Sequence, residues 1–188
     1  VPCILLMDEV VAHMREKVEL PEKLTVEIIN RKKPDSQITH YQPYKDYDGD
    51  GIPPMACFGE GIPFHVTGLI HDESGFPSTN PIVTEKLINR LMSKIYNNLD
   101  DIVEYEMLYT EDADTVIITF GSTARSAVRA VKLLRQKGIM VGMLRLKTIW
   151  PFAHKAIKEL SRKAVKNLIV AEMNYGQLIE TVKALAEG

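Results

Sequence analysis

The sequence is poor in cysteine, in net charge and in long hydrophobic runs, and each scarcity excludes a class of protein. Its 188 residues include two cysteines, Cys3 and Cys57, in no CxxC pair. Two cysteines are too few for a disulfide framework, a structural zinc site or an iron–sulfur cluster. Any redox centre that works with this protein must therefore be supplied by another chain.

Charge and hydropathy exclude two further classes of partner. A net charge of −2 gives no overall field that would attract nucleic acid or an anionic membrane. The longest apolar runs, such as CILLM and VIITF, are far shorter than the roughly 20 residues that span a bilayer, and no signal peptide opens the chain. The sequence therefore predicts a cytoplasmic protein with no nucleic-acid partner and no membrane partner.

Hydrophobic residues make up 45% of the chain, enough to bury a substantial core. From residue 114 onward, three apolar runs, DTVIITF, IMVGMLRL and KNLIVAEM, alternate with three helical patterns. The helices are expected from about Ser122 to Gly138, in HKAIKELSRKAV and in QLIETVKALAE. Strand–helix alternation with short connections predicts an α/β fold, a parallel sheet flanked by helices.

The earlier part of the chain has fewer regular elements. Cys3–Met7 is expected to be a buried strand that leads into a short helix, and the start at Val1 favours a fragment of a longer chain. A helix is expected between Thr84 and Leu99, with Thr84 as its N-cap. Residues 100–114 carry seven acids and no basic residue, which predicts a solvated turn and a domain boundary near Asp112.

Residues 34–84 form the least regular segment, with seven of the ten prolines and six of the eleven glycines. A loop of this length in a compact protein is usually functional or a flexible linker. Its aromatic side chains indicate an ordered loop with apolar anchors, namely Tyr41, Tyr44, Tyr47, Phe58, Phe64 and Phe76.

The first polar motif in this loop resembles the opening of a calcium-binding loop. Asp46, Asp48, Asp50 and Gly51 have the expected spacing, but the twelfth position is Cys57, where such a loop needs a bidentate glutamate. The pattern therefore favours a turn-rich loop without calcium.

The second polar motif is HVTGLIHDESG. Its histidines, His65 and His71, are six residues apart, and no zinc-hydrolase pattern has that spacing. A metal site and an acid/base site stay open here. The residues favour a loop in which polar side chains satisfy unpaired backbone groups.

Two further patterns each allow two interpretations. Gly121-Ser122-Thr123, between a strand and a helix, could bind a phosphate, or Ser122 could simply cap the helix. Ten basic residues and one acid, Glu159, occur between Lys132 and Lys166, which suits a docking face for an acidic partner or an ordinary solvated helix face.

Five segments together resemble one known family, the alpha subunit of the 2-oxoacid:ferredoxin oxidoreductases, closest to its 2-oxoglutarate type. They are MDEVVAHMRE, DGIPPMACFGEG, HVTGLIHDESG, LRLKTIWPF and EMNYGQ. The resemblance implies a thiamine-diphosphate enzyme that oxidatively decarboxylates a 2-oxoacid with coenzyme A. The products would be acyl-CoA, carbon dioxide and reduced ferredoxin.

The resemblance also implies a layout. Residues 1–19 would end a pyrimidine-binding domain, 20–113 would be an interdomain loop and helix, and 114–188 a truncated domain like the C-terminal domain of transketolase. Thiamine diphosphate with Mg²⁺ and the iron–sulfur clusters would lie mainly on the beta subunit and on any gamma or delta subunits. We expect this chain alone to bind none of them and to be inactive, since the family's catalytic glutamate lies upstream.

The resemblance leaves the catalytic residues unassigned, with His65 and His71 as candidates, in proton transfer or in a structural role. Thr67 and Asp72 are expected at the substrate end of the active-site cleft. Relatives often have Ser-Pro-Arg where this chain has Pro53-Pro54-Met55. An arginine that could hold a substrate carboxylate is thus missing there, which leaves the 2-oxoacid open.

Four residues near the ends of the second and third strands are expected at a subunit interface rather than in a ligand crevice: Arg145, Lys147, Glu172 and Asn174. No metal ligands are assigned. The alternative functions are a non-catalytic assembly domain and a pyruvate- or indolepyruvate-type oxidoreductase subunit.

Overall fold

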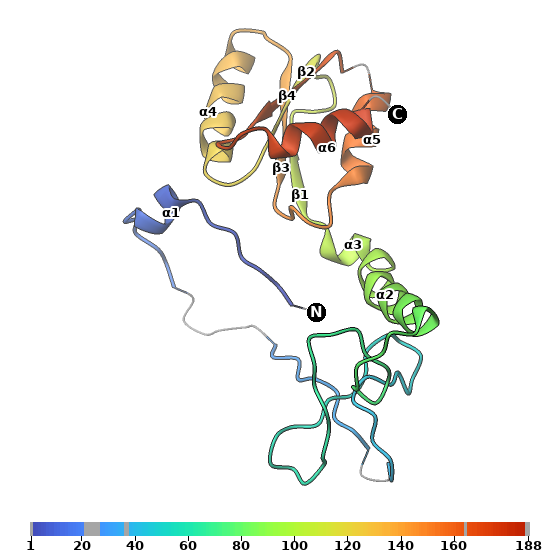
Figure 1. Cartoon of the computed structure of the whole chain (residues 1–188). Helices are drawn as coiled ribbons and strands as arrows, with labels where there is room; N and C mark the ends of the chain where they lie inside the picture. Colours follow the sequence, from blue (N-terminus) through green and yellow to red (C-terminus); the bar gives the residue numbers. More distant parts are fainter. Residues whose placement is uncertain (1, 21–26, 36–37, 164, 187–188) are drawn as a thin grey trace. The chain divides into compact units, whose positions relative to one another are not determined.

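The computed structural model describes residues 2–20, 27–35, 38–163 and 165–186 (Figure 1). The chain divides into two compact units. Unit 1 comprises Val1–Glu19 and Asp100–Gly188, and unit 2 comprises Leu20–Leu99.

Unit 1 is built on a four-stranded sheet with the order β1-β3-β2-β4. The strands β2 (Thr115–Thr119), β3 (Val141–Leu146) and β4 (Asn167–Ala171) are parallel, with Thr115 opposite both Val141 and Asn167. The α/β fold with a parallel sheet and flanking helices that the sequence predicts is confirmed.

The edge strand β1 (Tyr105–Leu108) runs antiparallel to β3, and the solvated turn predicted for residues 100–114 is wrong there. A short helix, α3 (Leu99–Ile102), precedes it. Glu106, one of the acids that suggested a turn, lies opposite Arg145 in the β1–β3 register and pairs with it at 3.2 Å. Cross-strand pairs of opposite charge stabilise such an edge strand.

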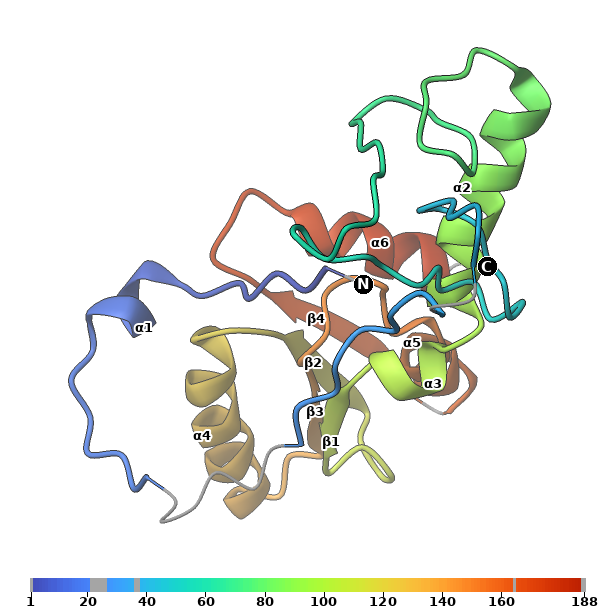
Figure 2. The same ribbon diagram turned by 90° about the horizontal axis from the view of Figure 1, so that it is seen from below.

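Helices cover both faces of the sheet (Figure 2). On one face, α4 (Thr123–Gln136) packs Ala127 and Val131 against β3. On the other face lie α5 (His154–Arg162) and α6 (Gln177–Ala186). Their apolar side chains join those of β2 and β3 in the larger core, which includes Val116, Ile118, Leu144, Ile157, Leu160 and Val182.

The N-terminal segment of unit 1 holds one helix, α1 (Glu9–His13). The strand predicted for Cys3–Met7 is not formed. Ile4 and Leu5 are 81% and 86% exposed, and no described strand pairs with this segment. A strand needs a hydrogen-bonded neighbour, so an apolar run without one stays irregular.

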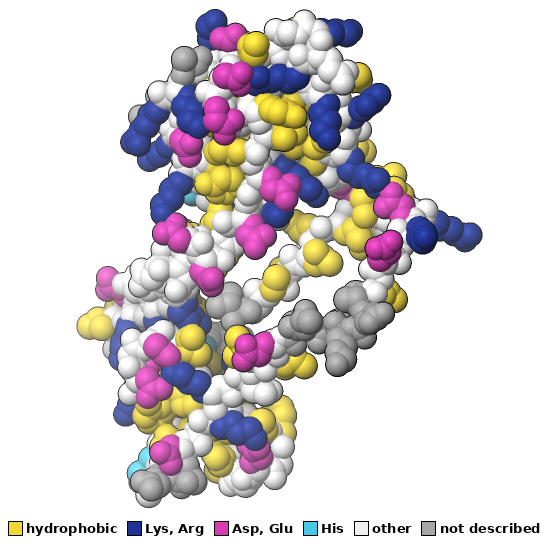
Figure 3. All heavy atoms as spheres, turned by 180° about the vertical axis from the view of Figure 1, so that it is seen from behind, with side chains coloured by type: hydrophobic (Ala, Val, Ile, Leu, Met, Phe, Trp, Pro, Cys, Tyr) yellow, Lys and Arg dark blue, Asp and Glu magenta, His cyan; other side chains and the backbone are white. Residues whose placement is uncertain are grey.

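Unit 2 contains α2 (Pro81–Tyr96) and the long loop. The helix is confirmed, but its predicted cap is wrong: Asn80, not Thr84, accepts a hydrogen bond from the Ile82 amide. Pro81 at the first helical position accounts for the earlier start, because its fixed φ suits a first turn. Figure 3 shows hydrophobic side chains at the surface among charged ones. None of the helices in the described part of the chain has the length and apolar character needed to cross a bilayer.

Candidate functional site

The HVTGLIHDESG motif lies on a tight reversal of the loop in unit 2. The amide of Asp72 donates to the Phe76 carbonyl at 3.2 Å, and the amide of Ser78 donates to the Ile70 carbonyl at 2.9 Å. His71 and Pro77 form an isolated antiparallel bridge. Gly75, with φ of +90°, closes the reversal against the His65 carbonyl, where a Cβ would overlap. The motif is therefore ordered by its own backbone.

The Asp72 carboxylate holds this turn together. It accepts hydrogen bonds from the Ser74 hydroxyl and from the Ser74 amide, the latter at 2.9 Å. These bonds, the one from the Ser74 hydroxyl foremost, hold the pKa of Asp72 below its ordinary value. Asp72 is therefore a carboxylate that shapes the loop, with its charge retained at neutral pH.

His71 is fixed in one tautomer by its neighbours. Its Nδ1 lies 2.9 Å from the Leu69 carbonyl oxygen, which can only accept, so Nδ1 carries the proton in the neutral ring and Nε2 is the acceptor. Nε2 is shielded from solvent and has no hydrogen-bond partner among the described residues. The ring packs on Tyr44, with the two centroids 3.9 Å apart.

His65 is the exposed histidine of the pair. Its ring stacks flat on Phe76, with centroids 4.5 Å apart and an interplanar angle of 1°. Nearby, the Thr67 hydroxyl accepts from the Leu69 amide at 3.2 Å. The four predicted site residues thus lie on one loop, where each histidine is oriented by a different aromatic ring.

The calcium-like motif upstream is occupied by protein groups. The two Asp46 oxygens accept from the amides of Gly49 and Gly51 at 2.8 and 2.7 Å. Asp48 and Asp50 share Lys32, at 2.7 and 2.5 Å. These contacts agree with the turn-rich loop that the sequence favours.

The aromatic residues of the loop anchor it unequally. Tyr41 donates its hydroxyl hydrogen to the Pro54 carbonyl at 2.9 Å and accepts from the Ala56 amide at 3.0 Å. Its ring meets Phe64 edge-on, with centroids 6.3 Å apart. Phe58 is 90% exposed but stacks on Phe64, with the two centroids 5.4 Å apart, so it anchors the loop through a ring contact at the surface.

At the start of α4, the position considered for a phosphate is filled by the chain itself. The Asp8 carboxylate accepts from the Ser122 amide at 2.6 Å, and a Cβ on Gly121 would approach the same oxygen. The hydrogen bond from the Ser122 amide lowers the pKa of Asp8 below its ordinary value. The Ser122 side chain makes no cap, contrary to the sequence-based alternative.

The contact of Asp8 with Ser122 cannot be read from a local pattern, because the two residues are 114 positions apart. The first turn of α4 contains no acid of its own, so a negative group from elsewhere is favourable at its N-terminus. Arg125 on the same helix also pairs with Glu16, at 2.7 Å. Residues 8–16 are thus held to α4 by two polar contacts that no local pattern reveals.

The residues predicted at an interface all have partners within unit 1. Arg145 pairs with Glu106 at 3.2 Å, and Lys147 pairs with the same carboxylate at 2.9 Å. The Asn174 side chain accepts from the Gly176 amide at 2.9 Å, and the Glu172 carboxylate accepts from the amides of Leu178 and Ile179 in α6. Their role at an interface stays a prediction.

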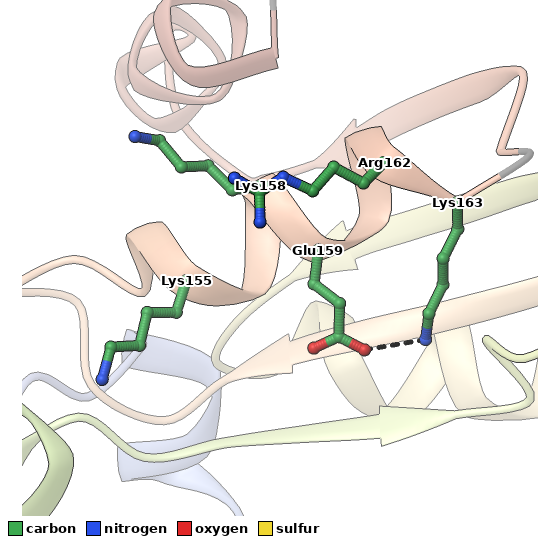
Figure 4. Close-up of a pocket in the computed structure, with 5 residues that line it drawn as sticks. All are labelled: Lys155, Lys158, Glu159, Arg162 and Lys163. Carbon is green, nitrogen blue, oxygen red and sulfur yellow. Dashed lines mark ion pairs between the residues drawn. The ribbon is translucent and has the colours of Figure 1, made fainter.

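The basic run is densest on α5 and at the residue that follows it, where five residues line an open hollow of about 550 Å³: Lys155, Lys158, Glu159, Arg162 and Lys163 (Figure 4). Glu159 pairs with Lys163 at 2.8 Å, and Lys155 pairs with Asp100. Lys158 and Arg162 extend from the same helix. The hollow is a cationic surface whose role as a docking face stays a prediction.

The described residues contain no cluster of metal-binding side chains. No group of three or more His, Cys, Asp or Glu side chains among them could hold a metal ion. Cys3 and Cys57 are both exposed and belong to different units.

Comparisons with known proteins define first the class of the sheet-containing unit. Residues 113–188 match the model of the pyruvate:ferredoxin oxidoreductase core domain II. This range contains the three parallel strands and the helices α4, α5 and α6.

Relatives that match over the full chain make the class more specific. The 2-oxoglutarate synthase subunit KorA of Methanothermobacter marburgensis is 43% identical over 100% of this chain and 49% of its own length. The KorA of Methanocaldococcus jannaschii is 42% identical over the same shares. These matches confirm the predicted relationship to the alpha subunits of the 2-oxoacid:ferredoxin oxidoreductases.

A solved structure of the same family is also similar to this chain. It is the 2-oxoglutarate:ferredoxin oxidoreductase of Magnetococcus marinus, with 2-oxoglutarate, coenzyme A and succinyl-CoA bound. The TM-score is 0.74 at 34% identity, over 84% of this chain and 28% of that one. The chain spans about half the length of the curated relatives it matches.

Proposed function

We propose that the chain forms part of the alpha subunit of a thiamine-diphosphate-dependent 2-oxoacid:ferredoxin oxidoreductase. The reaction would be the oxidative decarboxylation of a 2-oxoacid, with 2-oxoglutarate as the first candidate. Coenzyme A would accept the acyl group, and ferredoxin the electrons. The observation that carries the proposal is the alignment of the entire chain with 2-oxoglutarate synthase subunits.

The proposal extends to partners. A beta subunit, and gamma or delta subunits where present, would supply most of the cofactors. Arg145, Lys147, Glu172 and Asn174 would lie at the boundary with such a subunit. The layout proposed is 1–19, 20–113 and 114–188, in a cytoplasmic complex.

Between the two histidines, His65 is the better candidate for contact with a substrate. Its ring is exposed and preset by the stack on Phe76, whereas the free nitrogen of His71 is shielded from solvent. A proton can be transferred only between groups within hydrogen-bond reach. His71 therefore suits the positioning of the loop, together with Thr67 and Asp72.

The first experiment tests the reaction. The full-length chain assembled with its partner subunits should oxidise 2-oxoglutarate in the presence of coenzyme A and an electron acceptor of the ferredoxin type, and should prefer it to pyruvate and indolepyruvate. A preference for pyruvate or indolepyruvate would replace 2-oxoglutarate as the proposed substrate. No activity with any 2-oxoacid would favour a non-catalytic assembly domain.

The second experiment separates proton transfer from packing at His65. His65→Phe keeps a flat ring against Phe76 but has no titratable nitrogen, and His65→Ala loses both. If His65 transfers a proton, both variants should lower turnover by roughly 10²-fold or more at unchanged assembly. Full turnover in His65→Phe would assign the ring a structural role. The exposed His13→Ala, far along the sequence in α1, is the control.

A further inference from the structure

The N-terminal segment of unit 1 is attached to the rest of the unit by polar groups rather than by apolar packing. Between residues 2 and 19, every residue is exposed except Asp8, which is half-buried. The apolar neighbours of Asp8 stay in solvent: Met7 and Val10 are 60% and 49% exposed, and α1 has no buried residue. The attachment of this segment therefore depends mainly on its charged side chains.

Two polar contacts join this segment to one helix. The Asp8 carboxylate accepts from the Ser122 amide at 2.6 Å, and the Glu16 carboxylate pairs with the Arg125 guanidinium at 2.7 Å. Ser122 and Arg125 are three residues apart at the start of α4, so both contacts meet the same turn of this helix. We call residues 8–16 the strap.

The contact of Asp8 is closely fitted, whereas that of Glu16 is not. Gly121 has a φ of +60°, and a Cβ added there would lie 2.5 Å from the Asp8 oxygen that accepts from Ser122. The positive end of the α4 dipole also favours a carboxylate at this position. By contrast, the side chains of Arg125 and Glu16 are 60% and 52% exposed, and a pair as exposed as this contributes little by itself.

Asp8 also connects the contact with α4 to the helix within the strap. Its carbonyl accepts from the amides of Val11 and Ala12 in α1, at 3.0 and 3.1 Å. Because α1 has only five residues, it is too short to be stable without outside support. Detachment of Asp8 from α4 should therefore also melt α1.

We propose that Asp8 and Glu16 form a two-point latch through which the strap attaches to α4 and detaches from it as one unit. The bond of Asp8 brings Glu16 within reach of Arg125, and the ion pair in turn limits the rotation of the strap about Asp8. Detachment uncovers the start of α4. In the proposed layout residues 1–19 end a separate domain, so the latch would also hold that domain against residues 114–188. This last consequence alone rests on the proposed function.

Amide hydrogen exchange on the full-length chain, followed by NMR, tests the latch without catalysis. The Ser122 amide reports on α4, and the Ala12 amide reports on the strap. Arg125→Gln removes the ion pair but contacts neither reporter, and it should speed the exchange of both amides roughly two- to fivefold. Asp8→Asn keeps an oxygen acceptor but loses the charge, and it should speed both roughly five- to tenfold.

Two neighbouring residues provide matched controls. Glu9→Gln removes the acid next to Asp8, which faces His13 within α1, and Arg129→Gln removes an exposed cation one turn further along α4. Both variants should leave the exchange of the Ser122 amide unchanged. If Ser122 exchanges at the wild-type rate in Arg125→Gln, the two contacts are independent and the latch is overturned. Wild-type exchange of Ala12 in Asp8→Asn would overturn it as well.

Discussion

The two units of this chain are stabilised in different ways. Of the described hydrophobic residues that are buried, those of unit 2 are Ala56, Leu87 and Ile95, and all others lie in unit 1. Unit 1 packs two helical layers on a sheet, whereas the loop of unit 2 is held by side chains that bond its backbone, such as Tyr41, Asp46 and Asp72. The stabilisation of unit 1 by apolar packing is divided among many small contacts, whereas in the loop each segment of backbone is held by one or two hydrogen bonds.

This difference predicts how a single substitution should affect the stability of each unit. In unit 1 the loss should scale with the buried volume removed, since cavities are costly in close-packed cores. In unit 2 the loss should depend on whether a particular hydrogen bond or backbone conformation survives. Substitutions chosen in pairs can test both statements.

The largest effect is expected from Leu160→Ala, because Leu160 is fully buried among α5, α6 and the sheet. The change should reduce the free energy of unfolding of unit 1 by roughly 2–5 kcal/mol. Fluorescence of Trp150, the single tryptophan and a member of this unit, would follow unfolding in urea. Leu133→Ala, at a position that is 40% exposed, should have a much smaller effect. Equal losses would contradict a core-dominated unit 1.

Gly75→Ala should be the most damaging single change in the loop. It forces φ of +90° on a residue with a Cβ and drives that Cβ into the His65 carbonyl. The expected loss is roughly 1–3 kcal/mol, with displacement of His65 from Phe76 visible in the ring resonances by NMR. Gly61 has a φ of +79°, but no atom lies within 4 Å of a Cβ added there. Gly61→Ala therefore measures the cost of the backbone conformation without a close contact. Equal effects would show that the close approach is unimportant.

Tyr41→Phe tests the polar bonds themselves. It keeps the ring contact with Phe64 but removes the hydroxyl that joins Pro54 to Ala56. The expected loss is roughly 1–2 kcal/mol, because an amide and a carbonyl lose their partner. Hydrogen exchange at the Ala56 amide should become faster. Tyr96→Phe, on a ring that is 52% exposed, should leave that exchange unchanged.

Sequence patterns predicted unit 1 better than unit 2 for the same physical reason. Apolar runs such as VIITF determine burial over several residues at once, so β2, β3 and β4 were found. The short β1 was not predicted, because the partner of Glu106 is Arg145 on β3, and a local pattern of acids does not show that pairing.

Some of the site was readable from local rules, and some was not. Asn80 followed by Pro81 is a local helix-start signal that gives the true beginning of α2, whereas the apolar spacing alone favours Thr84. That Asp72 would satisfy backbone groups followed from its position in a glycine-bearing turn. The stack of His65 on Phe76 and the contact of Asp8 with Ser122 depend on how distant parts of the chain meet, which no local spacing specifies.

The smallest expected effect is the pH response of the turn at Asp72. Its native pKa lies below the ordinary value of 3.8, so the carboxylate stabilises the turn fully above that pH. The stabilisation of the turn by Asp72 is lost as the pH falls through the lowered native pKa. Protonation then removes the negative charge to which the Ser74 amide and hydroxyl donate. The Ser74 amide resonance should therefore shift only in acid, and Asp72→Asn should abolish the shift. Asp101→Asn, on the exposed α3, should preserve it, and a shift of Ser74 that persists in Asp72→Asn would place the titrating group elsewhere.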